Sequence, residues 1–110
     1  MTVQRISNFE IGGIEVVNLA RYKDFGQEGD FIVDRRTPYG NRFRMKNDSD
    51  AERNRVCEAY AVWLEARLEK DSAFLDPLLG ARRLGCWCAP KRCHAESIAR
   101  AIVSMRRTEG

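Results

Sequence analysis

The chain has 110 residues, of which 44% are hydrophobic and 32% charged, and its formal net charge is +3. This length is typical of one domain, and such a domain buries roughly two-thirds of its unfolded surface, enough for a core without cross-links. No segment approaches the roughly 20 apolar residues of a membrane span, and residues 1–5 lack the apolar stretch of a signal peptide. We therefore expect a single cytoplasmic domain with reduced cysteines and no membrane partner.

Two short segments in the first third of the chain are predicted to be β-strands. Residues 14–19 are rich in β-branched side chains and follow the turn signal Gly12-Gly13. Residues 31–33, Phe-Ile-Val, form a second apolar run. The remainder of residues 20–48 shows no periodicity, and a long irregular stretch within a compact domain is often functional.

This irregular stretch is also basic. Five basic residues and no acidic residue lie between Arg35 and Lys46, and a second basic group flanks the cysteines near the C-terminus. A local positive surface suits an anionic ligand such as a phosphate or a nucleic-acid backbone. Solvated surface arginines account for the same pattern, so charge alone does not decide between the two interpretations.

The clearest helical pattern in the chain covers residues 49–70. Ser49 and Glu52 have the spacing of a capping box, in which both side chains satisfy free backbone N–H groups. Val56, Tyr60 and Trp63 then recur at helical spacing, which predicts an amphipathic helix with these aromatic residues in the core. Cys57, on the same stripe, is expected to be a small buried apolar residue.

The last third of the chain predicts one more strand and one more helix. Residues 83–88 have the pattern of a strand that Pro90 ends, and apolar residues at 98, 102 and 105 indicate a helix over residues 94–107. The order strand, helix, strand, helix favours the α/β class. We expect a single small domain in which a short, mostly parallel sheet packs against the two main helices.

Residues 86–94, Cys-Trp-Cys-Ala-Pro-Lys-Arg-Cys-His, contain three of the four cysteines and the only histidine. In a strand, Cys86 and Cys88 face one way and Trp87 the other. Cys93 is placed at a helix start, where free N–H groups and partial positive charge favour a thiolate and a depressed pKa. The same groups, with the preceding basic pair Lys91 and Arg92, can hold a phosphate.

Three interpretations of this cysteine run remain open. In the first, a zinc ion is bound by Cys86, Cys88, Cys93 and His94, although the spacing is not that of a CxxC pair. In the second, Cys93 and His94 act as nucleophile and acid–base in an enzyme or anion site. In the third, the thiols pack in the core and His94 caps the helix. A redox dithiol is disfavoured because CxC spacing strains a disulfide.

Two motifs in the chain resemble those of a known family. Residues 84–94, Leu-Gly-Cys-Trp-Cys-Ala-Pro-Lys-Arg-Cys-His, look like the C-terminal signature of the domain-of-unknown-function family 4326, small bacterial proteins often carried by phages. Residues 36–43 resemble its arginine, proline turn and Gly-Asn-Pro-Phe motif, and residues 17–19 its opening strand. Arg42 stands where the family commonly has proline, and Tyr39 where it has leucine. The family-like core covers about residues 14–102, and residues 1–12 are left as an N-terminal extension.

The resemblance carries no assigned activity, but it implies that the 36–43 loop and the cysteine run meet in space. A loop that contains Gly40-Asn41 can adopt positive φ and bring backbone close to a ligand. The favoured hypothesis is a domain that binds or acts on a nucleotide-like or nucleic-acid anion, with Cys93 and His94 as the reactive pair and ligand contacts from Arg36, Asn41, Arg42, Lys91 and Arg92. The alternatives are a non-enzymatic zinc-stabilised module that binds a protein, and a thiol-containing core with the function elsewhere.

Overall fold

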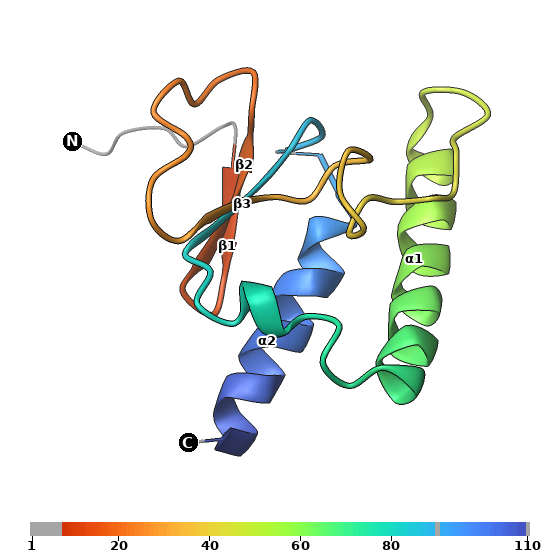
Figure 1. The fold of residues 1–110 in the computed structure, drawn as a ribbon. Helices are drawn as coiled ribbons and strands as arrows, with labels where there is room; N and C mark the ends of the chain where they lie inside the picture. Colours follow the sequence, from red (N-terminus) through yellow and green to blue (C-terminus); the bar gives the residue numbers. More distant parts are fainter. Residues whose placement is uncertain (1–7, 90, 110) are drawn as a thin grey trace.

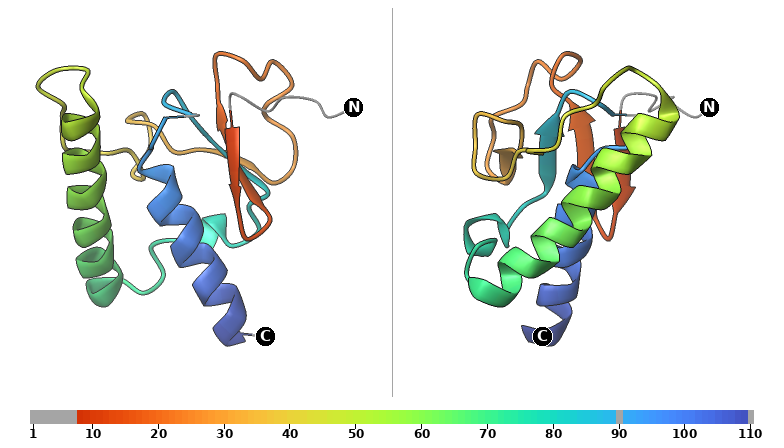
Figure 2. Two further views of the ribbon diagram at one scale, coloured as in Figure 1. Left: turned by 180° about the vertical axis from the view of Figure 1, so that it is seen from behind. Right: turned by 90° about the vertical axis from the view of Figure 1, so that its right-hand side faces the viewer.

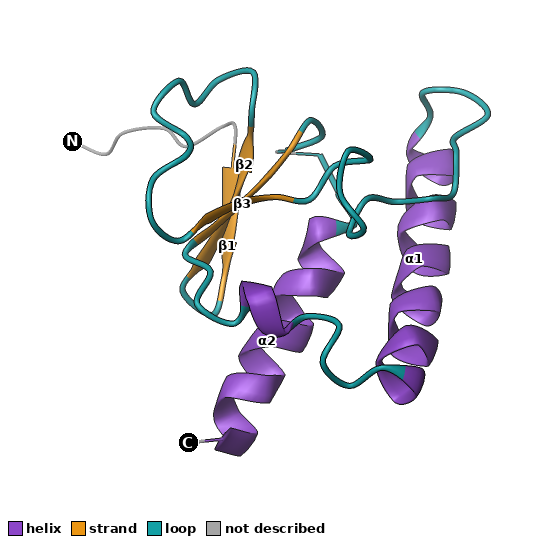
Figure 3. Cartoon of the chain, viewed as in Figure 1, coloured by secondary structure: helices purple, strands orange, loops and turns teal. Residues whose placement is uncertain are grey.

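The computed structural model describes residues 8–89 and 91–109, and Figures 1 and 3 show its strands and helices. Pro90, expected to end a strand, lies outside the described residues. The elements are β1 (Asn8–Ile11), β2 (Ile14–Asn18), β3 (Asp30–Ile32), α1 (Asp50–Lys70), the short 3₁₀ helix η1 (Asp76–Leu78), β4 (Arg83–Cys86) and α2 (Ala95–Glu109).

The four strands form one sheet in the order β1-β2-β4-β3. β1 and β2 are antiparallel, whereas β4 is parallel to both β2 and β3, which confirms the expected small α/β domain with a mostly parallel sheet. Gly12 and Gly13 connect β1 to β2 with φ angles of 58° and 91°, as in tight hairpin turns that need two left-handed residues. Residues 8–11, which the motif comparison leaves outside the family-like core, thus belong to the sheet.

The parallel strands bring three loops to one edge of the sheet. Asn18 at the end of β2 is paired in register with Cys86 at the end of β4, and Ile32 at the end of β3 is paired with Gly85. The segments that follow each of these strands therefore leave the sheet on the same side. In open α/β sheets, ligands bind at this carboxyl edge, beside the strand at which the connections diverge.

The two helices form successive layers beside the sheet (Figures 1 and 2). α2 packs directly on β1, β2 and β4, and α1 packs mainly on α2, so α1 forms the outer layer. The core between these layers holds fully buried residues from every layer, among them Ile14, Val16, Tyr60, Leu84, Ile98 and Ile102. No helix within the described ranges is long and apolar enough to cross a membrane.

The start of α1 differs from the predicted capping box. Ser49 Oγ accepts a hydrogen bond from the backbone N–H of Glu52 at 3.1 Å, which is the expected half of the motif. The Glu52 carboxylate instead accepts from the backbone N–H of Lys46 at 2.8 Å and pairs with Arg55. The Glu52 side chain therefore holds the end of the basic loop at Lys46 and does not complete the cap of its own helix.

β4 ends two residues earlier than the predicted strand because a side chain, not a neighbouring strand, bonds the backbone after Cys86. Beyond Cys86, the Asn18 amide donates to the backbone carbonyls of Trp87 at 3.2 Å and Ala89 at 2.9 Å. The chain turns at this point and does not continue as a strand, so the residues that follow Cys86 lie at the edge of the sheet.

Candidate functional site

A cavity of about 420 Å³ lies at the carboxyl edge of the sheet, within the size range of small-molecule sites. Its wall comes from the loop after β3, the first turns of α1, the end of β4 and the segment that leads into α2. It is lined by Asp34, Arg35, Arg36, Asn41, Phe43, Met45, Arg53, Val56, Cys57, Cys86, Trp87, Cys88, Arg92, Cys93 and His94. The 36–43 loop and the cysteine run thus meet in space, as the motif resemblance implied.

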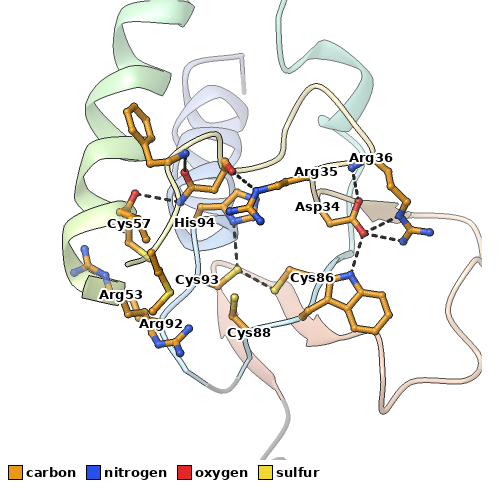
Figure 4. A pocket seen from close by; sticks show the side chains of 15 residues that line it. Asp34, Arg35, Arg36, Arg53, Cys57, Cys86, Cys88, Arg92, Cys93 and His94 are labelled. Carbon is orange, nitrogen blue, oxygen red and sulfur yellow. Dashed lines mark hydrogen bonds and ion pairs between the residues drawn. The ribbon is translucent and has the colours of Figure 1, made fainter. Parts of the chain in front are cut away.

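Three thiols gather at the centre of this wall (Figure 4). Cys93 Sγ lies 2.9 Å from Cys86 Sγ, and both side chains are buried. Cys88 is only partly buried. Hydrogen bonds from the Cys86 and Cys93 thiols hold the pKa of Cys88 far below its ordinary value, and the nearby Arg53 charge acts in the same direction. Cys88 is therefore the thiol that is both accessible and suited to be a thiolate.

The depressed pKa expected at Cys93 is wrong. Its contacts with Cys86 and Cys88 raise the pKa of Cys93 well above the ordinary value, and its burial raises it further. The backbone N–H of Ala95 does approach Cys93 Sγ at 3.5 Å, so the helix start contributes a weak contact. The contacts with Cys86 and Cys88 outweigh it, and burial acts in the same direction because a charged thiolate loses its solvation in the core.

His94 is fixed in one orientation behind the thiols. Its Nε2 lies 2.6 Å from the carbonyl oxygen of Val33, and because a carbonyl only accepts, the proton resides on Nε2. Nδ1 is then the acceptor, 3.5 Å from Cys93 Sγ. Burial lowers the pKa of His94, which favours the neutral ring. The unprotonated Nδ1 of His94 thus faces the Cys93 thiol.

The cavity wall carries four arginines but a single carboxylate, Asp34. Arg53 is 9% exposed and pairs with Asp48 at 2.7 Å, and its buried Nε has no hydrogen-bond partner among the described residues. Arg92 donates to Asn54 at 3.1 Å and forms longer ion pairs with Glu58 at 3.5 Å and Glu96 at 3.9 Å. Arg35 donates to the carbonyl of Asn41 at 2.9 Å, and no carboxylate in the described part of the chain pairs with it. Positive charge therefore predominates on the wall itself, although carboxylates outside the lining pair with two of its arginines.

Asp34 organises one side of the cavity. Its side chain accepts from the Arg36 guanidinium at 2.8 and 2.9 Å, from the Arg36 backbone N–H at 2.9 Å and from Trp87 Nε1 at 3.0 Å. The hydrogen bonds from Arg36 and Trp87 lower the pKa of Asp34 to about 2. The carboxylate is thus charged at neutral pH, and it holds an arginine and a tryptophan at once.

The structure places most of the predicted site residues on the cavity wall. Arg36, Asn41, Arg92, Cys86, Cys88, Cys93 and His94 all line it, and two predicted ligand contacts do not. The Arg42 guanidinium lies over the ring of Trp63, 5.4 Å from its centroid, and lines a neighbouring hollow. Lys91 is exposed outside the cavity lining.

Asn41 and Gly40 shape the loop rather than offer groups to a ligand. The Asn41 amide donates to the carbonyl of Val56 at 3.1 Å and accepts from the N–H of Phe43 at 2.9 Å. Neither Gly40 nor Asn41 adopts the positive φ that such a loop allows. Gly40 is needed for another reason, since a Cβ there would lie 2.5 Å from the Asp34 carbonyl oxygen.

The residues of the cavity wall that sequence reasoning missed include Asp34, Arg35, Arg53 and Trp87. Asp34 is the only acidic residue next to the basic run, a signal that could have marked it. The strand pattern predicts that Trp87 faces away from the cysteines, but the turn after Cys86 brings it onto the same wall. Arg53 lies on α1 and carries no sequence signal that separates it from surface arginines.

The described residues contain no group of three or more His, Cys, Asp and Glu side chains arranged to hold a metal ion. The expected zinc site at Cys86, Cys88, Cys93 and His94 therefore stays a prediction, which metal analysis tests directly.

The fold and the cavity together define a small α/β domain with a site of thiols and arginines at the carboxyl edge of its sheet. The family model described as a domain of unknown function, DUF4326, matches residues 17–104. The chain belongs to this family, which confirms the motif resemblance, and the match includes every residue that lines the cavity. No curated protein and no solved structure matches the chain.

Proposed function

We propose that the cavity binds a small phosphate-bearing, nucleotide-like molecule. The observation that carries this proposal is the charge of the wall, which is lined by four arginines and one carboxylate. That carboxylate pairs with Arg36, whereas the carboxylate partners of Arg53 and Arg92 lie outside the cavity lining. Buried or partly buried positive charge is costly unless an anion compensates it. A bound phosphate supplies that compensation through charge-assisted hydrogen bonds, which are roughly twice as strong as neutral ones.

The arginines suited to the phosphate lie beside the thiols. Figure 4 shows Arg53 and Arg92 on one side of Cys88, with Arg36 on the opposite side. Arg53 is nearly buried, and its one carboxylate partner, Asp48, is largely exposed to solvent. Its charge is therefore only partly compensated within the protein. A phosphate bound between Arg53 and Arg92 would be next to the accessible thiol of Cys88.

A small molecule fits this cavity better than a nucleic-acid strand. The volume of about 420 Å³ lies between the 33–49 loop and α1 and has the size of a small-molecule site, whereas proteins that bind single strands use long grooves that follow the backbone. The apolar part of the wall, which includes Phe43, Met45 and Val56, suits the non-phosphate part of the ligand. The thiol of Cys88 would supply a nucleophile for chemistry on that ligand.

Calorimetric titration with two probes, adenosine 5′-monophosphate and inorganic phosphate, tests the proposal. We expect the monophosphate to bind reduced protein, and Arg92→Met or Arg35→Met to weaken it about 10-fold or more, the effect of removing a charge-assisted hydrogen bond. Arg107→Met is the matched control, because Arg107 is exposed at the far end of α2. Affinity unchanged in both cavity variants, or no binding of either probe at millimolar concentration, would overturn the proposal.

A salt titration with a ten-residue oligothymidine separates the small ligand from a nucleic acid. Binding of the oligonucleotide that is tighter than that of the monophosphate, and that falls steeply with salt, would indicate counterion release along a strand. That result would replace the small-molecule proposal with a nucleic-acid interface.

The zinc-stabilised module is the second candidate, and it rests on the proximity of Cys86, Cys88 and Cys93. Elemental mass spectrometry on protein purified without a histidine tag or chelator tests it. About one zinc per chain, with a melting temperature that falls by many degrees on chelation, would favour the module, since structural zinc contributes directly to folding. Metal-free protein of unchanged stability would rule it out.

A further inference from the structure

Trp87 is an unusual residue in the cavity wall because its large apolar side chain is exposed. It is 55% exposed, although both its neighbours in the run, Cys86 and Cys88, point into the cavity wall and are at least partly buried. An indole left in water forfeits the hydrophobic stabilisation that its burial would give. Because Trp87 also lines the cavity, its exposed ring offers an aromatic surface to a ligand, and such surfaces are common in small-molecule sites.

The indole is also held in place, unlike most exposed side chains. Its Nε1 donates to Asp34 at 3.0 Å, and its backbone carbonyl accepts from the Asn18 amide at 3.2 Å. Asp34 is itself buried, with 9% of its surface exposed. The ring orientation is therefore set before any ligand arrives, which reduces the entropy lost on binding.

The same carboxylate places a second recognition group beside the indole. Asp34 Oδ2 accepts from both Nε and one terminal nitrogen of Arg36, at 2.9 and 2.8 Å. The Arg36 side chain remains 65% exposed, so its other terminal nitrogen is available to a ligand. One buried carboxylate thus fixes an exposed aromatic face and an exposed guanidinium as a pair.

We propose that Trp87 is the stacking platform for the aromatic base of the ligand, and that Arg36 donates hydrogen bonds to the edge of that base. This inference rests on the proposed function and adds the substrate class, a purine or pyrimidine nucleotide rather than a sugar phosphate. Stacking on an indole suits any planar base, because every base has a π-face. The phosphate then extends across the thiols toward Arg53 and Arg92, on the other side of the cavity (Figure 4).

Tryptophan fluorescence gives a direct readout, because the chain has only two tryptophans. In a Trp63→Phe background, Trp87 is the only indole, and we expect adenosine 5′-monophosphate to quench it and ribose 5-phosphate to leave it nearly unchanged. In the otherwise unaltered protein, Trp87→Ala should weaken the nucleotide about 5- to 150-fold, the range for loss of one stacking contact. Trp87→Phe should retain most of the affinity for the nucleotide. Ribose 5-phosphate should bind wild type, Trp87→Ala and Trp87→Phe equally.

The outcomes separate this inference from the proposed function. If Trp87→Ala weakens the nucleotide and ribose 5-phosphate equally, or neither, while both bind wild type, the base does not stack on Trp87 and the anion pocket stands. If neither probe binds wild type, both proposals fail. Time-resolved anisotropy of unliganded Trp63→Phe protein is a second test: a fixed indole shows no rapid local rotation, and a freely rotating Trp87 would overturn the platform.

Discussion

Substitution of Gly40 by alanine should disturb the cavity through the backbone alone. A Cβ at this position would lie 2.5 Å from both Arg35 Cα and the Asp34 carbonyl oxygen, and 2.7 Å from the Arg35 nitrogen. Ordinary contacts of a Cβ begin at 3.4 Å, so the two backbone segments must separate by roughly an ångström. All three atoms belong to the backbone, and no flexible side chain can move aside to relieve the contact.

The expected cost of Gly40→Ala follows from this overlap. Overpacking of this kind costs about 1–3 kcal/mol, and a domain of this length loses about 4 °C of melting temperature per kcal/mol. We therefore expect a decrease of about 4–12 °C. Because the displaced segment carries Asp34 and Arg35, affinity for adenosine 5′-monophosphate should decrease as well.

Thermal unfolding by circular dichroism and calorimetric titration measure the two effects, with Gly80→Ala as the matched control. A methyl group at Gly80 would have no atom within 4 Å, and the φ angle of Gly80 is not positive. Alanine there should change stability by less than about 1 kcal/mol, with a small gain from the stiffer unfolded chain. A Gly40→Ala protein that melts within about 2 °C of wild type and binds the nucleotide equally would refute the reasoning.

Two further predictions concern other charged groups. The Asp30 carboxylate is 3% exposed and accepts hydrogen bonds from Arg83 at 2.6 and 2.9 Å, which lower the pKa of Asp30. The contribution of this pair to the stability of the fold is therefore present above the unfolded pKa of about 4 and is lost as pH falls through the folded pKa. Asp30→Asn should cost about 3 kcal/mol in urea unfolding at pH 7 and less below pH 4, and an unchanged midpoint at pH 7 would contradict this. Iodoacetamide should alkylate Cys88 before the buried thiols, with a rate that falls less than about tenfold from pH 8 to pH 5, whereas an ordinary thiol slows by several hundredfold. Peptide mapping identifies the alkylated cysteine and gives the rate at each pH. Preferential alkylation of Cys93 would show that the accessible thiolate is assigned to the wrong residue.

Local signals in the sequence were sufficient for most of the elements and for the fold class. The helical stripe through Val56 and Tyr60 and the β-branched run at 14–18 act over a few residues, so their periodicity predicts α1 and β2 without knowledge of the rest. β1 was missed because a four-residue edge strand that is stabilised by pairing with β2 has little periodicity of its own. The position of α1, packed on α2 rather than on the sheet, depends on which faces meet, and a pattern along one helix does not specify its partner.

The sequence by itself determined that a site of thiols lies at residues 86–94, because neighbours in the chain stay close in any fold. Only the tertiary structure decided which thiol is accessible, since the fold brings Cys93 against Cys86 and Cys88 and buries it, which raises the pKa of Cys93, and leaves Cys88 partly exposed. It also decided the partners: Asp34, more than 50 residues away in sequence, anchors Trp87. Contacts of that sequence separation arise only when the parallel strands place their carboxyl ends at one edge, and no local pattern encodes that arrangement.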